Sequence, residues 1–235
     1  MHRTQTSGTD PRTGIFTTGC VHPGSAVAWL GAGWSYFMRM TAPLAVLSVT
    51  LLGAALLTST RVGAVLFPAA VIFYLGIVAG YCRTLDQGEQ VPCDHAQVYG
   101  SASLWIVAAV ASAVALGLRR LGETIGAPAL APSWLIGEHF GRPDLYFLAV
   151  IALTLLACMA FCMAPALVIL NGANPLRAIC LSLLGSLKNV VPLLAFFVLT
   201  GALLILGILP LGAGLIVAMP VAACGTFKAY EKIFN

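Results

Sequence analysis

Charge is scarce in this chain. Twelve Lys and Arg and eight Asp and Glu make up nine per cent of its 235 residues, against sixty per cent hydrophobic residues and a mean hydropathy of +0.96. Soluble domains carry about 25% charged residues, so an ordinary soluble domain is excluded. The composition predicts a polytopic membrane protein, and its long apolar stretches predict an all-α helix bundle with about six transmembrane helices.

Ionisable residues are missing above all from the apolar stretches. Away from their ends, the six predicted spans contain no Asp, Glu, Lys, Arg or His. The spans cover about residues 43–59, 63–81, 100–118, 145–170, 191–208 and 211–228. Ion-coupled transporters, proton relays and intramembrane hydrolases usually need an ionisable group at depth. The sequence therefore predicts no catalysis within the membrane and no enzyme.

The motifs of soluble enzymes and nucleic-acid-binding proteins are missing too. No glycine-rich phosphate loop, nucleophile elbow or pair of carboxylates at catalytic spacing occurs. The basic residues cluster only at Arg119–Arg120, so no nucleic-acid partner is predicted. The polar residues 1–24 contain no apolar core, which argues against a cleavable signal peptide and predicts a disordered cytoplasmic tail.

Seven cysteines are present without the spacing of a disulfide framework. Two Cys-x-His pairs, Cys20 with His22 and Cys93 with His95, supply the residue types of a tetrahedral zinc site. Structural zinc pairs prefer two to four intervening residues, whereas these pairs have one. We therefore favour loop residues without a ligand, predict no metal or other cofactor, and keep the four residues as candidate ligands.

What the chain does contain is a segment that recurs at one offset. Residues 174–232 align without a gap on residues 25–83, which lie 149 positions earlier. The matched residues include Ser25 with Asn174, Arg39 with Lys188, Pro43 with Pro192 and Tyr81 with Tyr230. The recurrence of a helix cap, a basic residue, a proline and a tyrosine predicts an internal duplication.

Each copy is expected to open with an amphipathic helix of roughly four turns and to continue as two spans. In the second copy, one face carries Ile179, Leu183 and Leu187, and the other carries Ser182, Ser186 and Asn189. Tryptophan, tyrosine and arginine in the first copy favour a helix in the headgroup layer of the membrane. A helix packed on the bundle is the alternative.

Four residues are predicted to make helix-packing or partner contacts. Gly76 and Gly80 lie one turn apart in the second span, and small residues at this spacing let a neighbouring helix approach closely. Trp29 and Trp34 in the first amphipathic helix are the aromatic candidates.

The distribution of Lys and Arg predicts the orientation. Eight lie on the side that holds the N-terminal tail, the second and fourth loops and the C-terminus, and four lie on the other side. This asymmetry places both termini in the cytoplasm. The predicted transmembrane domain, residues 25–235, comprises repeat 1 (25–83), a central hairpin (100–170) and repeat 2 (174–232). Two spans separate the copies, so the repeat is parallel.

Five short motifs in the second half form a recognisable set. They are Phe161-x-x-Ala164-Pro165-Ala166-Leu167, Asn174-Pro175-Leu176-x-Ala178, Lys188-Asn189-x-x-Pro192, Pro210-Leu211-Gly212-x-Gly214-Leu215 and Tyr230-x-Lys232-Ile233-Phe234. Residues 158–234 closely, and 25–83 loosely, resemble a family of uncharacterised polytopic inner-membrane proteins of bacteria. The resemblance implies the bacterial inner membrane and no established enzyme activity. The N-terminal tail and the Cys-x-His pairs depart from the family.

Two functions remain open at this point. The leading hypothesis is a non-catalytic accessory or scaffold subunit that packs against a larger membrane protein complex or organises lipid around it. Its expected partners are the lipid bilayer and other membrane-protein subunits. The alternative is a transporter or channel for a small apolar or amphipathic solute.

Overall fold

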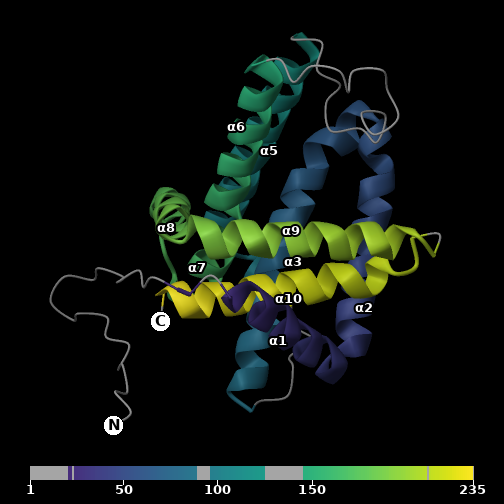
Figure 1. Ribbon diagram of the computed structural model, residues 1–235, viewed down its shortest axis with the longest axis vertical. Helices are drawn as coiled ribbons and strands as arrows, with labels where there is room; N and C mark the ends of the chain where they lie inside the picture. The colour runs from purple at the N-terminus through teal and green to yellow at the C-terminus, as the bar shows by residue number, and fades with distance from the viewer. Residues whose placement is uncertain (1–20, 23, 89–95, 125–144, 211, 235) are drawn as a thin grey trace, which may run out of the picture.

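The computed structural model describes residues 21–22, 24–88, 96–124, 145–210 and 212–234, and within these ranges all regular secondary structure is helical (Figure 1). In chain order the elements are α1 (Ser25–Arg39), α2 (Thr41–Leu56), the 3₁₀ turn η1 (Leu57–Ser59), α3 (Arg61–Asp86), α4 (Ala96–Tyr99), α5 (Ala102–Thr124), α6 (Leu145–Phe161), α7 (Ala164–Asn171), α8 (Pro175–Lys188), α9 (Val190–Ile208) and α10 (Leu215–Phe234). The expectation of an all-α protein is confirmed.

Four helical segments are long and apolar enough to cross a membrane, namely Val62–Asp86, Ala102–Thr124, Leu148–Asn171 and Val190–Ile208. A fifth candidate arises if α1 and α2 form one span bent by 106°. The expected spans at 43–59 and 211–228 fall in α2 and α10, which are not among the four. α2 has 16 residues, fewer than the roughly 20 that a bilayer requires, and α10 ends in a charged segment. The count of six stays a prediction.

Two sharp bends divide the amphipathic helices from the helices that follow them. Met40 between α1 and α2 has φ −129° and ψ 39°, and Asn189 between α8 and α9 has φ −124° and ψ 39°. Pro43 and Pro192 each follow three residues later. Because proline has no N–H, the carbonyl four residues earlier loses its helical partner, and the helix breaks there.

The helix boundaries of the two predicted copies can be compared at the offset of 149 positions. α1 and α8 end at Arg39 and Lys188, and α2 and α9 begin at Thr41 and Val190. α10 begins five residues later than α3 predicts, at 215 instead of 210, after a turn in which Gly212 has a φ of 83°. The boundaries agree at the junction of the first two helices and diverge at the start of the third. Ser25, expected to cap the first helix, lies inside α1 after the N-cap Gly24, whereas Asn174 is the N-cap of α8. The parallel repeat stays a prediction.

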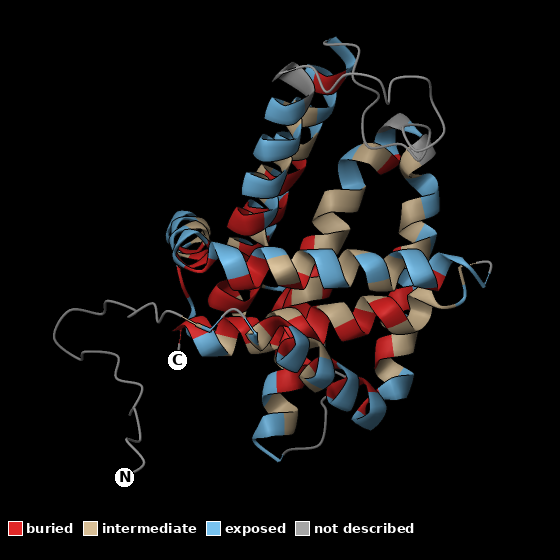
Figure 2. Ribbon diagram, in the orientation of Figure 1, coloured by how far each residue is buried: buried red, intermediate tan, exposed pale blue. Residues whose placement is uncertain are grey.

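The helices run in two main directions. In Figure 1, α9 and α10 lie across the direction of α5 and α6, and α8 is seen nearly end-on. Figure 2 shows buried residues concentrated where α10 meets its neighbours and along α7. The core includes Leu44, Val78, Leu104, Leu167, Leu193 and Ile233, all at most 1% exposed. The core therefore joins both predicted copies and the central hairpin.

The outer faces of the helices are strongly apolar. Exposed residues include Val49 of α2, Ile106 of α5, Leu156 of α6 and Ile205 of α9. Soluble monomers rarely expose apolar surface on this scale. Together with the candidate spans, these faces indicate a membrane protein.

Candidate functional site

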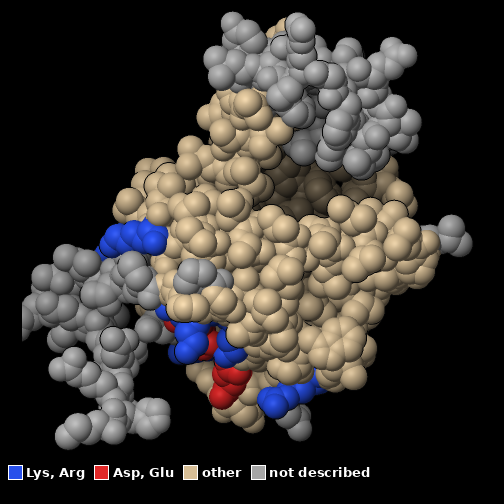
Figure 3. Space-filling model, viewed as in Figure 1, with Lys and Arg blue, Asp and Glu red and all other residues tan. Residues whose placement is uncertain are grey.

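The charged cluster consists of Tyr36 of α1, Asp86 of α3, and Lys228 and Glu231 of α10. Figure 3 shows charged side chains gathered near the C-terminal part of α10 and the lower edge of this face. Each member lies in the C-terminal half of its helix, where polar groups can reach the surface while their stems pack. The cluster thus ties three helices together at one end of the molecule.

Lys228 is the centre of this cluster. Its Nζ lies 3.2 Å from Asp86 Oδ2 and 2.5 Å from Glu231 Oε2. The same ammonium lies 5.0 Å from the centroid of the Tyr36 ring and 5.6 Å from that of Phe227, and these two rings meet edge to face at 6.1 Å. The Tyr36 hydroxyl donates a hydrogen bond to Asp86 Oδ1. One cation is therefore enclosed by two carboxylates and two aromatic rings.

The surroundings keep Tyr36 and Lys228 in their ordinary charge states. Burial raises the pKa of the Tyr36 hydroxyl, and its hydrogen bond to Asp86 raises it further. Burial alone would lower the pKa of Lys228, but hydrogen bonds with Glu231, Tyr36 and Asp86 outweigh it, so the net shift of that pKa is upward. A neutral phenol and a charged ammonium form a structural tie between helices.

Replacing Lys228 with Met is expected to lower the unfolding free energy by about 1–3 kcal/mol, because Asp86 and Glu231 would face each other without their shared cation. Thermal unfolding in detergent measures this loss, with Lys232→Met at an exposed position one turn on as the control.

Because the pKa of Lys228 is raised in the folded protein, the stability that its charge contributes is fully present below the unfolded pKa of about 10.4. It is lost only as the pH rises through the folded pKa, so this residue adds no pH dependence between about pH 7 and 9. Equal stability of K228M and K232M would contradict the role of the cluster.

A second polar arrangement lies at the break between α6 and α7. Pro165 near the start of α7 lacks the N–H that would continue the helix. The Met159 carbonyl accepts hydrogen bonds from the hydroxyls of Ser182 and Ser186, at 3.0 Å and 3.1 Å. The Met163 N–H donates to Ser182 Oγ at 3.3 Å. Two serines of α8 thus satisfy backbone groups at the break.

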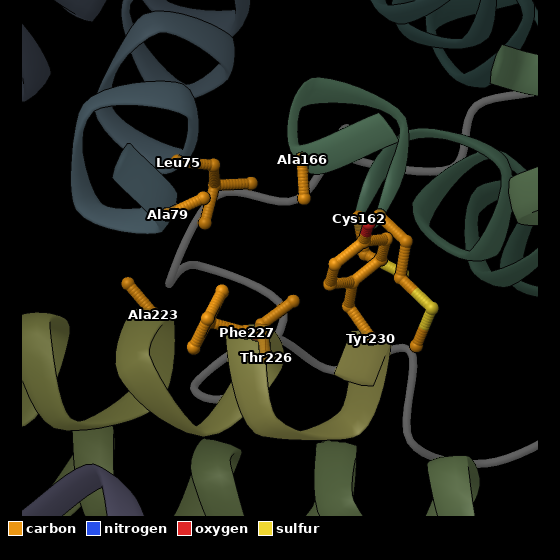
Figure 4. Close-up of a pocket in the computed structure, with 9 residues that line it drawn as sticks. Leu75, Ala79, Cys162, Ala166, Ala223, Thr226, Phe227 and Tyr230 are labelled. Carbon is orange, nitrogen blue, oxygen red and sulfur yellow. The ribbon is translucent and has the colours of Figure 1, made fainter. Parts of the chain in front are cut away.

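Next to this break lies a small void between α3, α7 and α10 (Figure 4). Its volume is ≈ 10 Å³, which is about the room of one water molecule. Its lining is mostly apolar and includes Leu75, Ala79, Ala166, Ala223 and Phe227. Pockets for organic ligands hold about 300–1,000 Å³, so this void is a packing defect and not a substrate site.

The two predicted glycine contacts differ in their surroundings. Gly76 is buried, and a Cβ there would lie 3.3 Å from Leu104 Cδ2 and 3.6 Å from Ile169 Cγ1. Gly76 therefore lies where α3 packs closely on α5 and α7 within the chain. A Cβ at the half-buried Gly80 would meet no described atom within 4 Å.

The two predicted tryptophans also differ in position. Trp29 is 3% exposed, and its ring meets Phe196 edge-on with centroids 5.8 Å apart. Trp34 is 51% exposed, with its ring 6.1 Å from that of Phe37. Trp29 belongs to the core of the chain, and Trp34 presents its ring to the surroundings.

The candidate zinc ligands fall mostly outside the described residues, which include neither Cys20 nor Cys93 nor His95. His22 is described, and its Nδ1 accepts a hydrogen bond from the Gly24 N–H at 3.1 Å. Across the described ranges, no three His, Cys, Asp or Glu side chains come together as metal ligands. The metal hypothesis is therefore untested.

Sequence reasoning missed the charged cluster. Lys228 and Glu231 stand at a spacing typical of a helical ion pair, which was the only signal available. Asp86 lies 142 positions before Lys228, and Tyr36 lies still further away. Only the packing of α1 and α3 on α10 brings these groups together.

Comparison with known proteins adds no identification. No protein-family model, curated protein or solved structure matches this chain. The resemblance of residues 158–234 to a bacterial family stays a hypothesis.

Proposed function

We propose that this chain is a non-catalytic integral protein of the bacterial inner membrane that packs as an accessory or scaffold subunit against another membrane protein. The observation that carries the proposal is a row of small residues on the outer face of α5. Ala109, Ala113 and Gly117 follow one another at intervals of four and are all exposed. A Cβ at Gly117 would meet no described atom within 4 Å.

Small residues at this spacing suit contact between membrane helices. They allow two backbones to approach closely enough for extensive dispersion contact, which flexible lipid tails match poorly. The opposite face of α5, with Leu104, Val107 and Ala108, is buried in the chain. The row is therefore the side of α5 that its own bundle leaves open, and a partner helix would fill it.

The pairing of interior polar groups supports a non-catalytic role. Ser48 and Tyr74, both buried, lie within 3.2 Å of each other through their hydroxyl oxygens. Ser182 and Ser186 bond the Met159 carbonyl, and both carboxylates of the charged cluster pair with Lys228. These groups hold the fold together, as buried polar groups usually do.

The proposal includes six spans, a parallel repeat and both termini in the cytoplasm. The basic asymmetry of the sequence supports the orientation. The equal backbone conformations at Met40 and Asn189, each three residues before a proline, support the repeat.

A carrier for a small apolar or amphipathic solute is the second candidate. The break between α6 and α7 favours it, because many transporters build their sites at discontinuous helices. A carrier is expected to purify alone in mild detergent, whereas a subunit purifies with a stoichiometric partner.

The double substitution Ala109→Leu with Ala113→Leu tests the accessory role directly. The added side chains would hold a partner helix away from α5, at a cost on the order of 1–3 kcal/mol, or about five- to 150-fold in affinity. Quantitative co-purification of the tagged full chain from native membranes is the measurement. Thermal unfolding is expected to be unchanged, because the row faces outward.

Ala152→Leu, at an exposed alanine of α6 with leucines four residues before and after it, is the matched control. It is expected to leave the partner bound. The proposal would be overturned if the wild-type protein purified without a stoichiometric partner. It would also be overturned if the double variant co-purified with the same amount of partner as the wild type.

A further inference from the structure

Helix α8 has its apolar side turned outward. Its buried residues are Ala178, Ser182, Gly185 and Ser186, with both serines bonded to the Met159 carbonyl. Three of its five leucines are exposed, with Leu176 at 73%, Leu184 at 54% and Leu187 at 48%, whereas Leu181 packs against the core. A helix at a protein–water boundary has the opposite arrangement. The outer face of α8 is therefore suited to an apolar medium.

The length and direction of α8 show how it meets that medium. Its 14 residues span about 21 Å, too short for a hydrocarbon core of about 30 Å. In Figure 1, α8 is seen nearly end-on beside α9, which lies in the plane of the view. Because α8 is roughly perpendicular to the candidate span α9, α8 runs parallel to the plane of a bilayer that α9 crosses.

The charges of α8 identify the chemistry of its partner. Arg177 near the first turn and Lys188 at the last residue are both exposed, and α8 contains no acidic residue. The outward leucines suit contact with the acyl chains of lipids. The basic residue at each end of this face suits contact with the phosphate groups that lie above those chains. A partner helix would favour small residues over three large leucines.

We propose that the outer face of α8 is a binding surface for anionic phospholipid. Acyl chains would lie on Leu176, Leu184 and Leu187, and lipid phosphates would pair with Arg177 and Lys188. This surface is separate from the row on α5, and the inference does not depend on the accessory role.

Titration of the purified full chain with phosphatidylglycerol or phosphatidylcholine, followed by native mass spectrometry, tests the charge preference. The wild type is expected to retain phosphatidylglycerol preferentially. Arg177→Gln with Lys188→Gln is expected to weaken that binding about ten- to thirtyfold, since the loss of each basic residue removes one electrostatic attraction to the anionic lipid. The charge-preserving pair Arg177→Lys with Lys188→Arg is expected to keep it.

Arg119→Gln with Arg120→Gln, at the far end of α5, is the matched control and is expected to keep the preference. Equal retention of both lipids by the wild type would overturn the proposal. So would a loss of preference in the α5 control as large as that in the α8 variant.

A spin label on Cys180, which is exposed on α8, gives a second test that needs no change of charge. The other reactive cysteines are first replaced, and the labelled chain is placed in nanodiscs that contain phosphatidylglycerol. Collisions with oxygen are expected to exceed those with a water-soluble nickel complex. Dominant nickel collisions would place this face in water, and low collisions with both reagents would place it under protein; either result overturns the proposal.

Discussion

Replacing Gly33 with Ala is expected to lower the unfolding free energy by about 3 kcal/mol, because α1 docks on α10 through this position. A Cβ at Gly33 would lie 2.3 Å from the Val221 carbonyl oxygen and 3.0 Å from the Gly225 nitrogen. Both are backbone atoms of α10, so no side chain can rotate away to make room. The helices would have to separate, which would also loosen the buried Trp29.

Gly31→Ala in the same helix is the matched control. A Cβ there would meet no described atom within 4 Å, and alanine is favoured over glycine in a helix by about 1 kcal/mol. Thermal unfolding of the two variants in detergent is therefore expected to shift in opposite directions. Equal stability of G33A and G31A would mean that α1 does not pack closely on α10.

Replacing both Ser182 and Ser186 with Ala is expected to destabilise the protein by about 2–4 kcal/mol. The Met159 carbonyl would lose both hydroxyl donors and keep a weak hydrogen bond from the Cys162 thiol, and the Met163 N–H would lose its acceptor. All of the lost contacts are buried, so water cannot readily replace the serines, and each unsatisfied buried group costs about 1–3 kcal/mol. The break between α6 and α7 would lose its support.

Thr154→Ala provides the comparison within α6. The Thr154 hydroxyl donates to the Val150 carbonyl at 2.8 Å, four residues earlier in the same helix. That carbonyl lies within a regular helical turn, so T154A is expected to change the unfolding free energy by less than about 0.5 kcal/mol. A serine double variant as stable as T154A would show that the break does not depend on α8.

Much of the helical framework follows from local signals. The lost N–H groups of Pro43 and Pro192 account for the breaks after Arg39 and Lys188, and Asn174 with Pro175 marks the start of α8. The apolar stretches locate the four candidate spans. The expected span over 145–170 is interrupted at residues 162–163, because Pro165 also removes a helical hydrogen bond.

The candidate sites depended on information that sequence periodicity does not hold. The sequence shows the amphipathic pattern of α8, but it does not show that Ser182 and Ser186 face inward. Trp29 and Trp34 were equivalent in the sequence, and only the contact with Phe196 places Trp29 in the core. In the charged cluster, the partners lie too far apart along the chain for any local pattern to pair them.

By itself, the sequence determined the helical class, the breaks before Pro43 and Pro192 and the apolar character of the candidate spans. These properties depend on backbone groups within one or two turns and on the transfer of apolar side chains out of water. Only the tertiary structure decided which helix faces are buried and which polar groups meet. In a membrane, apolar residues are stable both in the core and against lipid, so hydrophobicity alone cannot distinguish inside from outside.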